Sequence, residues 1–231
     1  MNSSKKVAVG LSTMALALAW PVSAYAANLI SNGSFETPIL TPGSDFLIAT
    51  VGSSTVTGWT VTGPTGKNVA IIEALYNLPD GAGINFAAAD GVQWIDMTGT
   101  GANSTEGLLQ SVVLTPGAYN LSFYVGNVVA AAAFLGTQST VSLFINSTLA
   151  QSFTNVGAGG AGVNWQQFSY NFSASGPTSI EFRNGDAAND HLNGLDNVVL
   201  TAVPEPETYA MLLAGLGLLG WVGRRRKQQV A

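Results

Sequence analysis

The chain has 231 residues, of which 47% are hydrophobic, 9% are charged and none is cysteine. This length allows one domain with a sizeable core, and the lack of cysteine excludes a disulfide framework, leaving the core, a bound ion or both to hold the fold. Six of the eight basic residues lie at positions 5–6 and 224–227, so residues 27–203 have two basic and eleven acidic residues, a charge near −9 (2 − 11). Such an acidic surface repels phosphate, which excludes nucleic-acid binding.

The first 26 residues have the pattern of a secretory signal peptide. Two lysines at 5–6 precede an apolar run at 7–20, and Ala24 and Ala26 supply the small residues of a cleavage site. The run is too short to remain as a membrane anchor, and the cleavage pattern follows it directly. We therefore expect export by the general secretion machinery and cleavage by signal peptidase after Ala26.

Residues 27–202 have the composition and turn signals of one all-β domain. Glycine, Ser, Thr and Asn are abundant, which disfavours helices and favours short strands joined by turns. In the clearest strand Tyr119, Leu121, Phe123 and Val125 alternate on one face. The pattern predicts strands at 46–51, 59–61, 69–73, 92–97, 108–114, 119–125, 140–145, 149–153, 167–172, 180–182 and 195–201. Many short strands with turns between them are typical of an antiparallel sandwich.

The predicted strand at 92–97 contains the candidate carbohydrate site. Alternation places Trp94 and Asp96 on one face of the sheet and the apolar pair Ile95 and Met97 on the other, buried face. An indole beside a carboxylate suits a pyranose ring, because the aromatic face stacks on the C–H side of the sugar while Asp96 accepts its hydroxyl hydrogens. In the alternative interpretation Trp94 is an ordinary core residue.

An ordered series of short motifs runs through the domain. They lie at residues 28–36 (NLISNGSFE), 58–60 (GWT), 90–93 (DGVQ), 110 (Gln), 165–168 (WQQF) and 195–198 (LDNV). In this order they resemble galactose-binding-like jelly rolls, in particular the domains of unknown function shared by plant cell-wall proteins and exported bacterial proteins. The resemblance implies a jelly-roll β-sandwich that is often tied to polysaccharide, and it implies no catalysis. The chain departs from the family in its lack of cysteine and in an alanine-rich insert at 128–135.

The same resemblance implies a structural calcium ion. In related sandwiches a carboxylate from each end of the domain binds the ion, and the matching residues are Glu36 and Asp196, with Asn32 and backbone oxygens as helpers. Two carboxylates brought together in an acidic domain would repel each other unless a cation joined them. The alternative is that Glu36 caps a turn and that Asp196 and Asn197 only set a strand register.

The sequence predicts no catalytic residues. It has no nucleophile elbow, phosphate loop or zinc-ligand spacing. The single histidine, His191, lies in a polar stretch at 183–194 without a base partner or a second ligand fixed beside it. Asp186 and Asp190 in that stretch have the setting of solvated turn residues, although such oxygens also suit calcium.

The last 29 residues have three parts in a fixed order. Pro204, Glu205 and Pro206 form a stiff extended step, residues 209–223 are uncharged and rich in glycine, and Arg224, Arg225 and Arg226 begin a basic cluster. This order resembles the PEP-CTERM sorting signal of Gram-negative bacteria, which implies recognition and cleavage by an exosortase. We expect a transmembrane helix at about 208–223 with the basic cluster on the cytoplasmic side of the inner membrane, at least transiently. The alternative is an ordinary C-terminal anchor.

Three functions are consistent with the sequence. The first is a non-catalytic module that binds exopolysaccharide at the cell surface or in the extracellular matrix. The second is a structural matrix or biofilm protein with no dedicated ligand site. The third and least favoured is a glycoside hydrolase, because no motif or family resemblance supplies its acid pair.

Overall fold

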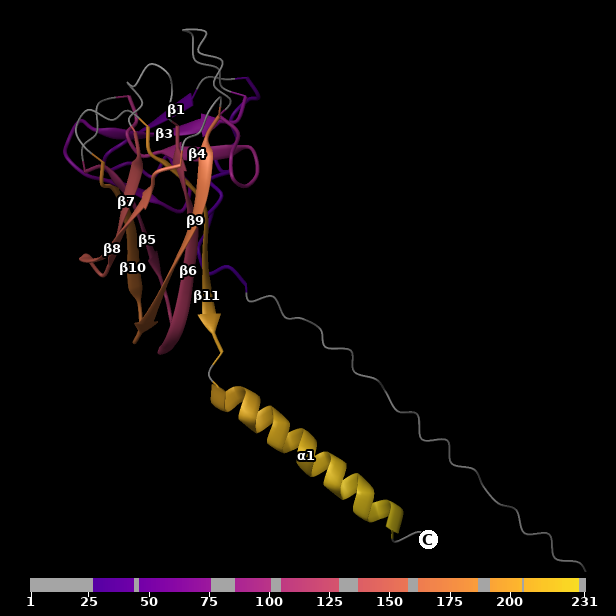
Figure 1. The fold of residues 1–231 in the computed structure, drawn as a ribbon. Coiled ribbons are helices and arrows are strands. Elements are labelled where there is room, and N and C mark those ends of the chain that lie inside the picture. The colour runs from indigo at the N-terminus through magenta and orange to yellow at the C-terminus, as the bar shows by residue number, and fades with distance from the viewer. Residues whose placement is uncertain are drawn as a thin grey trace, which may run out of the picture.

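The computed structural model describes residues 27–43, 46–75, 86–100, 105–128, 137–157, 162–186, 192–204 and 206–228 (Figure 1). The predicted signal peptide with Ala24 and Ala26, and Glu205, Asp190 and His191, lie outside these residues.

The described residues form eleven strands and one helix. These are β1 (Phe46–Thr50), β2 (Thr60–Thr62), β3 (Asn68–Glu73), β4 (Gln93–Asp96), β5 (Gly107–Val112), β6 (Gly117–Asn127), β7 (Ser139–Ile145), β8 (Thr148–Asn155), β9 (Asn164–Ala174), β10 (Thr178–Asn184), β11 (Gly194–Val203) and α1 (Pro206–Gln228). Each strand predicted from the sequence is present, and β6 and β9 are longer than expected because they pair along their whole length, from Gly117 with Ala174 to Asn127 with Asn164.

The strands form two antiparallel sheets that face each other (Figure 1). The six-stranded sheet has the order β1-β3-β4-β11-β6-β9, and the five-stranded sheet has the order β2-β5-β10-β7-β8. Both sheets mix strands from the two halves of the chain, so the sandwich closes only when distant segments have paired. The expected all-β jelly-roll sandwich is confirmed.

The main core lies between the two sheets. Leu121, Phe123 and Val125 of β6 are fully buried, as their alternation predicted. The Phe123 ring meets the Phe182 ring of the opposite sheet edge-on, with the centroids 4.9 Å apart. Burying a side chain of this kind contributes about 1.5–3 kcal/mol, so the two inner faces supply most of the driving force for folding.

A second apolar cluster covers part of the outer face of the six-stranded sheet. Its members point away from the main core, since they alternate with Ile71 and Ile95, which point into it. They are Ala70, Ile72, Phe86, Trp94, Val128 and Leu192. We call this set the outer cluster. Phe86, Val128 and Leu192 come from connections that follow or precede strands, so these connections fold over the sheet.

The C-terminal sorting segment forms a helix, α1, that begins at Pro206 and ends at Gln228. Its apolar side chains are exposed, and Figure 1 shows it beyond the end of β11. Among the described residues, no helix combines the length and the apolar character that a membrane crossing requires. The presence of a helix in this segment was predicted correctly. The transmembrane span expected at about 208–223 is not found among the described residues.

Candidate functional site

Trp94 of β4 lies in the outer cluster and has no exposed surface. Its indole N–H donates a 2.8 Å hydrogen bond to the carbonyl of Phe86, and its ring stacks on the Phe86 ring at 6.1 Å. The face of the sheet was predicted correctly, because Trp94 points away from Ile95 and Met97. The predicted exposure of Trp94 was wrong, because Phe86 and its neighbours in the outer cluster cover the indole. Trp94 is a packing residue in this structure and not an open platform for a sugar.

Asp96 shares this face of the sheet, because it stands two residues after Trp94 in β4, and it is also buried, with 7% of its surface exposed. Its Oδ1 accepts hydrogen bonds from the backbone N–H and hydroxyl of Thr98, at 2.9 and 2.8 Å, and from the backbone N–H of Asn193 at 3.2 Å. Burial raises the pKa of Asp96 to about 6; these hydrogen bonds lower it and the charge of Glu106 raises it. Asp96 thus holds two chain segments together beneath the surface.

Trp165 of β9 belongs to the 165–168 motif, and the structure leaves its side chain half-exposed. It pairs with Gly126 of β6, and Gly126 pairs with Gly194 of β11. A Cβ at Gly126 or Gly194 would lie 2.6 or 2.9 Å from carbon atoms of the indole ring. The indole therefore lies directly on the backbone of the sheet, across two glycines, and no larger residue fits beneath it.

Two contacts fix the position of the Trp165 ring. Its N–H donates a 2.8 Å hydrogen bond to the carbonyl of Ala87, and its edge meets Trp94 with the centroids 5.6 Å apart and the planes at 83°. The buried Trp94 thus supports the half-exposed Trp165. Gly126 stands in a strand of otherwise alternating apolar residues, and this was the only signal in the sequence that something packs closely there.

The outer face continues from Trp165 along β6 and β9 as a row of polar pairs. Their members share the face of Gly126 and Trp165, since every second residue of a strand points to the same side. The pairs are Tyr124–Gln167, Ser122–Ser169 and Asn120–Asn171. Tyr124 is half-exposed and Gln167 is exposed, and the amide of Asn120 donates a 2.7 Å hydrogen bond to the side-chain oxygen of Asn171. We call Trp165, Tyr124, Gln167, Ser169 and Asn171 the outer polar face.

Glu36 and Asp196, the two predicted calcium ligands, hold the same loop. Oε1 of Glu36 accepts the backbone N–H groups of Val92 and Gln93, at 2.8 and 2.9 Å. Oδ2 of Asp196 accepts those of Ala89 and Asp90, also at 2.8 and 2.9 Å. We call residues 89–93 the braced loop. The two carboxylates therefore accept backbone N–H groups from one short loop.

Asp196 is fully buried at a β-bulge. The bulge places Asn197 at φ 47°, a left-handed conformation that asparagine tolerates, and the backbone N–H of Asn197 donates a 2.6 Å hydrogen bond to Oδ1 of Asp196. Burial raises the pKa of Asp196 to about 7; hydrogen bonds from Asp90, Asn197 and Ala89 lower it, and the charge of Asp90 raises it.

The fit of this arrangement to calcium is limited in the described residues. Asn32 is committed elsewhere: its side-chain oxygen accepts the N–H of Thr37, and its amide donates to the carbonyls of Thr37 and Thr57. No three or more Asp, Glu, His or Cys side chains in the described ranges gather closely enough to hold a metal ion. Each carboxylate has a structural role without an ion, so calcium at Glu36 and Asp196 stays a prediction.

Comparison with known proteins identifies the C-terminal segment. Residues 202–227 match the PEP-CTERM protein-sorting motif. These include Pro204, which is exposed, and Arg225, whose guanidinium lies 4.0 Å from the centre of the Trp221 ring. The resemblance predicted from Pro204, Glu205, Pro206 and the arginine cluster is therefore confirmed. No curated protein matches the chain.

Several solved structures are similar to the sandwich at low sequence identity. TmCBM61, solved in complex with β-1,4-galactotriose, is 18% identical over 77% of this chain and 100% of its own, with a TM-score of 0.49. A family 35 carbohydrate-binding module from Clostridium thermocellum is 13% identical over 69% of this chain and 100% of its own, with a TM-score of 0.42. An arabinose-bound α-L-arabinofuranosidase, MgGH51, is 12% identical over 77% of this chain and 26% of its own, with a TM-score of 0.46.

Proposed function

We propose that the chain is an exported, exosortase-sorted protein whose sandwich binds polysaccharide without catalysis on its outer polar face. The sorting motif at residues 202–227 supports export and sorting by an exosortase. An exosortase that cleaves near Pro204 would release the sandwich toward the cell surface or the extracellular matrix of a Gram-negative bacterium. The signal-peptide pattern at residues 1–26 agrees with export.

The single observation that supports polysaccharide binding on the outer polar face is the position of Trp165 over Gly126 and Gly194. An indole that rests on backbone is held rigid, so it loses little conformational entropy when a ligand stacks on it. Apolar C–H faces of a sugar ring pack on such an aromatic surface, and Tyr124 on the neighbouring strand extends it.

The polar residues next to these rings supply the groups that sugar hydroxyls need. Gln167, Ser169 and Asn171 stand at every second position of β9, on the same side as Trp165. Amides and hydroxyls both donate and accept, which matches hydroxyl groups of either orientation. None of these side chains is charged, so the face suits a neutral glycan. This arrangement moves the proposed site from Trp94 and Asp96 to the strands beside them.

Retention of the full chain on a panel of insoluble polysaccharides tests the proposal. We expect depletion from solution onto at least one polysaccharide and a clear loss of retention in Tyr124→Ala. Leu149→Ala is the matched control, because Leu149 is 55% exposed on β8 of the other sheet. Equal retention of all three proteins would place binding elsewhere. Concentration-dependent self-association without any glycan would favour a structural matrix protein, and release of reducing sugar would favour a hydrolase.

A further inference from the structure

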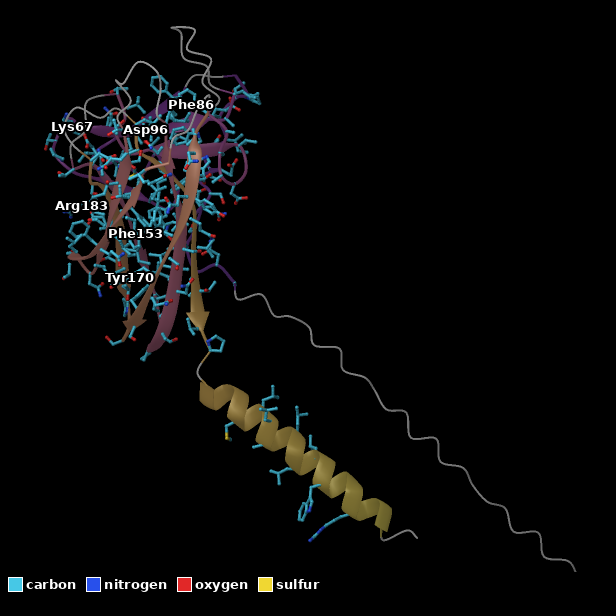
Figure 2. The ribbon with its side chains drawn as sticks, in the orientation of Figure 1. Lys67, Phe86, Asp96, Phe153, Tyr170 and Arg183 are labelled. Carbon is cyan, nitrogen blue, oxygen red and sulfur yellow. The ribbon has the colours of Figure 1, made fainter. Side chains whose placement is uncertain are left out.

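A group of buried oxygen atoms lies at the end of the sandwich opposite α1 (Figure 2, where Asp96 is labelled). Asp96 ends β4, Asn184 ends β10, Glu106 precedes β5 and Asn193 precedes β11. Antiparallel pairing of these strands brings the four positions to one end. Glu106 is 1% exposed and Asn193 is fully buried. Two acidic side chains are therefore removed from water at the same end of the sandwich, and the charge of Glu106 raises the pKa of Asp96.

Burial of the Asp96 carboxylate is costly unless a positive charge or strong hydrogen bonds offset it. In the described part of the chain, the hydrogen bonds to Asp96 come from the neutral groups of Thr98 and Asn193. The guanidinium of Arg183, one of the two basic residues of the sandwich, is paired with Glu181 at 2.8 Å.

Asn193 gives an independent indication of a ligand. Its amide nitrogen donates to the carbonyl of Thr140 and to the side-chain oxygen of Asn184. Because both partners are acceptors, the nitrogen and oxygen of the amide cannot be exchanged, and Oδ1 is the atom that is left for a further partner. This oxygen is buried and has no hydrogen-bond partner within the described residues. Leaving a buried amide oxygen without a partner is costly, so we expect a ligand to bind it.

We propose that Asp96, Glu106 and Oδ1 of Asn193 bind a divalent cation at this end of the sandwich. Two carboxylates and an amide carbonyl are hard oxygen donors, which favour calcium over zinc or copper, and backbone carbonyls or water complete its 6 to 8 ligands. The ion ties β4, β5 and β11, which belong to both sheets. This site is separate from the one predicted at Glu36 and Asp196, and it does not depend on glycan binding.

Calcium binding to the chelator-treated full chain, measured by equilibrium dialysis, tests this site. The variant Glu36→Gln is used throughout, because it disables the other predicted site. We expect this variant to bind one calcium ion per chain, and the added change Glu106→Gln to weaken binding at least tenfold. Asp90→Asn, an exposed acid outside the group, is the control and leaves binding unchanged. Absence of bound calcium in Glu36→Gln, or unaltered affinity in Glu106→Gln, overturns the proposal.

A second variant keeps the proposal testable if Glu106→Gln does not fold. Asn193→Asp adds a third carboxylate at the position of the amide. With a cation site, calcium affinity rises and calcium raises the unfolding temperature of Asn193→Asp more than that of the parent protein. If a water molecule fills the position, Asn193→Asp unfolds at a lower temperature and calcium does not restore it, which contradicts a cation site.

Discussion

Glu36 and Asp196 come from opposite ends of the domain sequence and hold adjacent parts of the braced loop, with N–H···O distances of 2.8–2.9 Å. The braced loop follows Phe86 and Ala87, which contact Trp94 and Trp165. Through these contacts the two carboxylates fix the segment that supports the outer polar face. Glycine is required at position 91, where φ is 71° and a Cβ would lie 2.3 Å from Oε1 of Glu36.

Removal of the Glu36 charge should loosen the braced loop. We expect Glu36→Gln to lower the free energy of unfolding by about 1–3 kcal/mol, since one carboxylate oxygen accepts two backbone N–H groups. Urea unfolding measures this difference. A stability equal to that of the wild-type protein would show that the loop does not depend on Glu36.

The predicted calcium ion at Glu36 and Asp196 makes a separate prediction. The melting temperature should rise with calcium and fall with chelator, and Asp196→Asn should reduce that response. The comparison is made in a Glu106→Gln background, so that the second proposed cation site does not contribute. An unchanged melting temperature in both conditions would leave Glu36 and Asp196 as loop braces only.

Stability in chelator should fall as the pH rises from 5 to 8. The pKa values of Asp96 and Asp196 in the folded protein, about 6 and about 7, lie above the ordinary value of 3.8. Between pH 3.8 and these values the folded state therefore binds more protons than the unfolded state. The stability that these two groups contribute is fully present below about pH 4 and is lost as the pH rises through 6–7. At roughly 1.4 kcal/mol per pKa unit, each group accounts for a loss on the order of 3 kcal/mol. Urea unfolding across this range tests the sign, and stability that rises with pH would contradict it.

The sequence predicted the positions of the strands more accurately than it predicted which side chains are exposed. Alternation of Leu121 and Phe123 is a local pattern, so it predicted β6 and its buried face. The face of Trp94 was also predicted, but its burial depends in part on Val128 and Leu192, which lie far from it in the chain. The position of Trp165 depends on glycines in two other strands, Gly126 and Gly194. Such contacts exist only after the sheet has formed and leave no periodic pattern.

Gly126→Ala tests whether the close contact with Trp165 matters. The new Cβ would lie 2.6 Å from the ring and 2.8 Å from a methyl group of Val163, so the indole must move. We expect a loss of about 1–3 kcal/mol in the free energy of unfolding and a changed near-ultraviolet circular dichroism spectrum. Gly176→Ala is the matched control, since no atom lies within 4 Å of its Cβ, and it should change stability by less than about 0.5 kcal/mol. Equal effects of the two changes would rule out the tight packing.

Processing at the C-terminus predicts a shorter mature protein in a host that has the exosortase. The exported product should lack everything after about residue 207, which intact-mass measurement detects. Replacement of Pro204, Glu205 and Pro206 by alanine should block processing and leave the full-length precursor. A wild-type mass that includes Arg224–Arg226 would indicate that the motif is not cleaved.

Calorimetric titration of the wild-type protein and Tyr124→Ala with one retained glycan tests the central claim most directly. Tyr124 is half-exposed and lies outside both apolar clusters, so its removal should leave the fold intact. We predict at least a tenfold increase in Kd for Tyr124→Ala, equivalent to about 1.4 kcal/mol, and no change for Leu149→Ala. A Kd for Tyr124→Ala within twofold of the wild-type value would contradict glycan binding on the outer polar face.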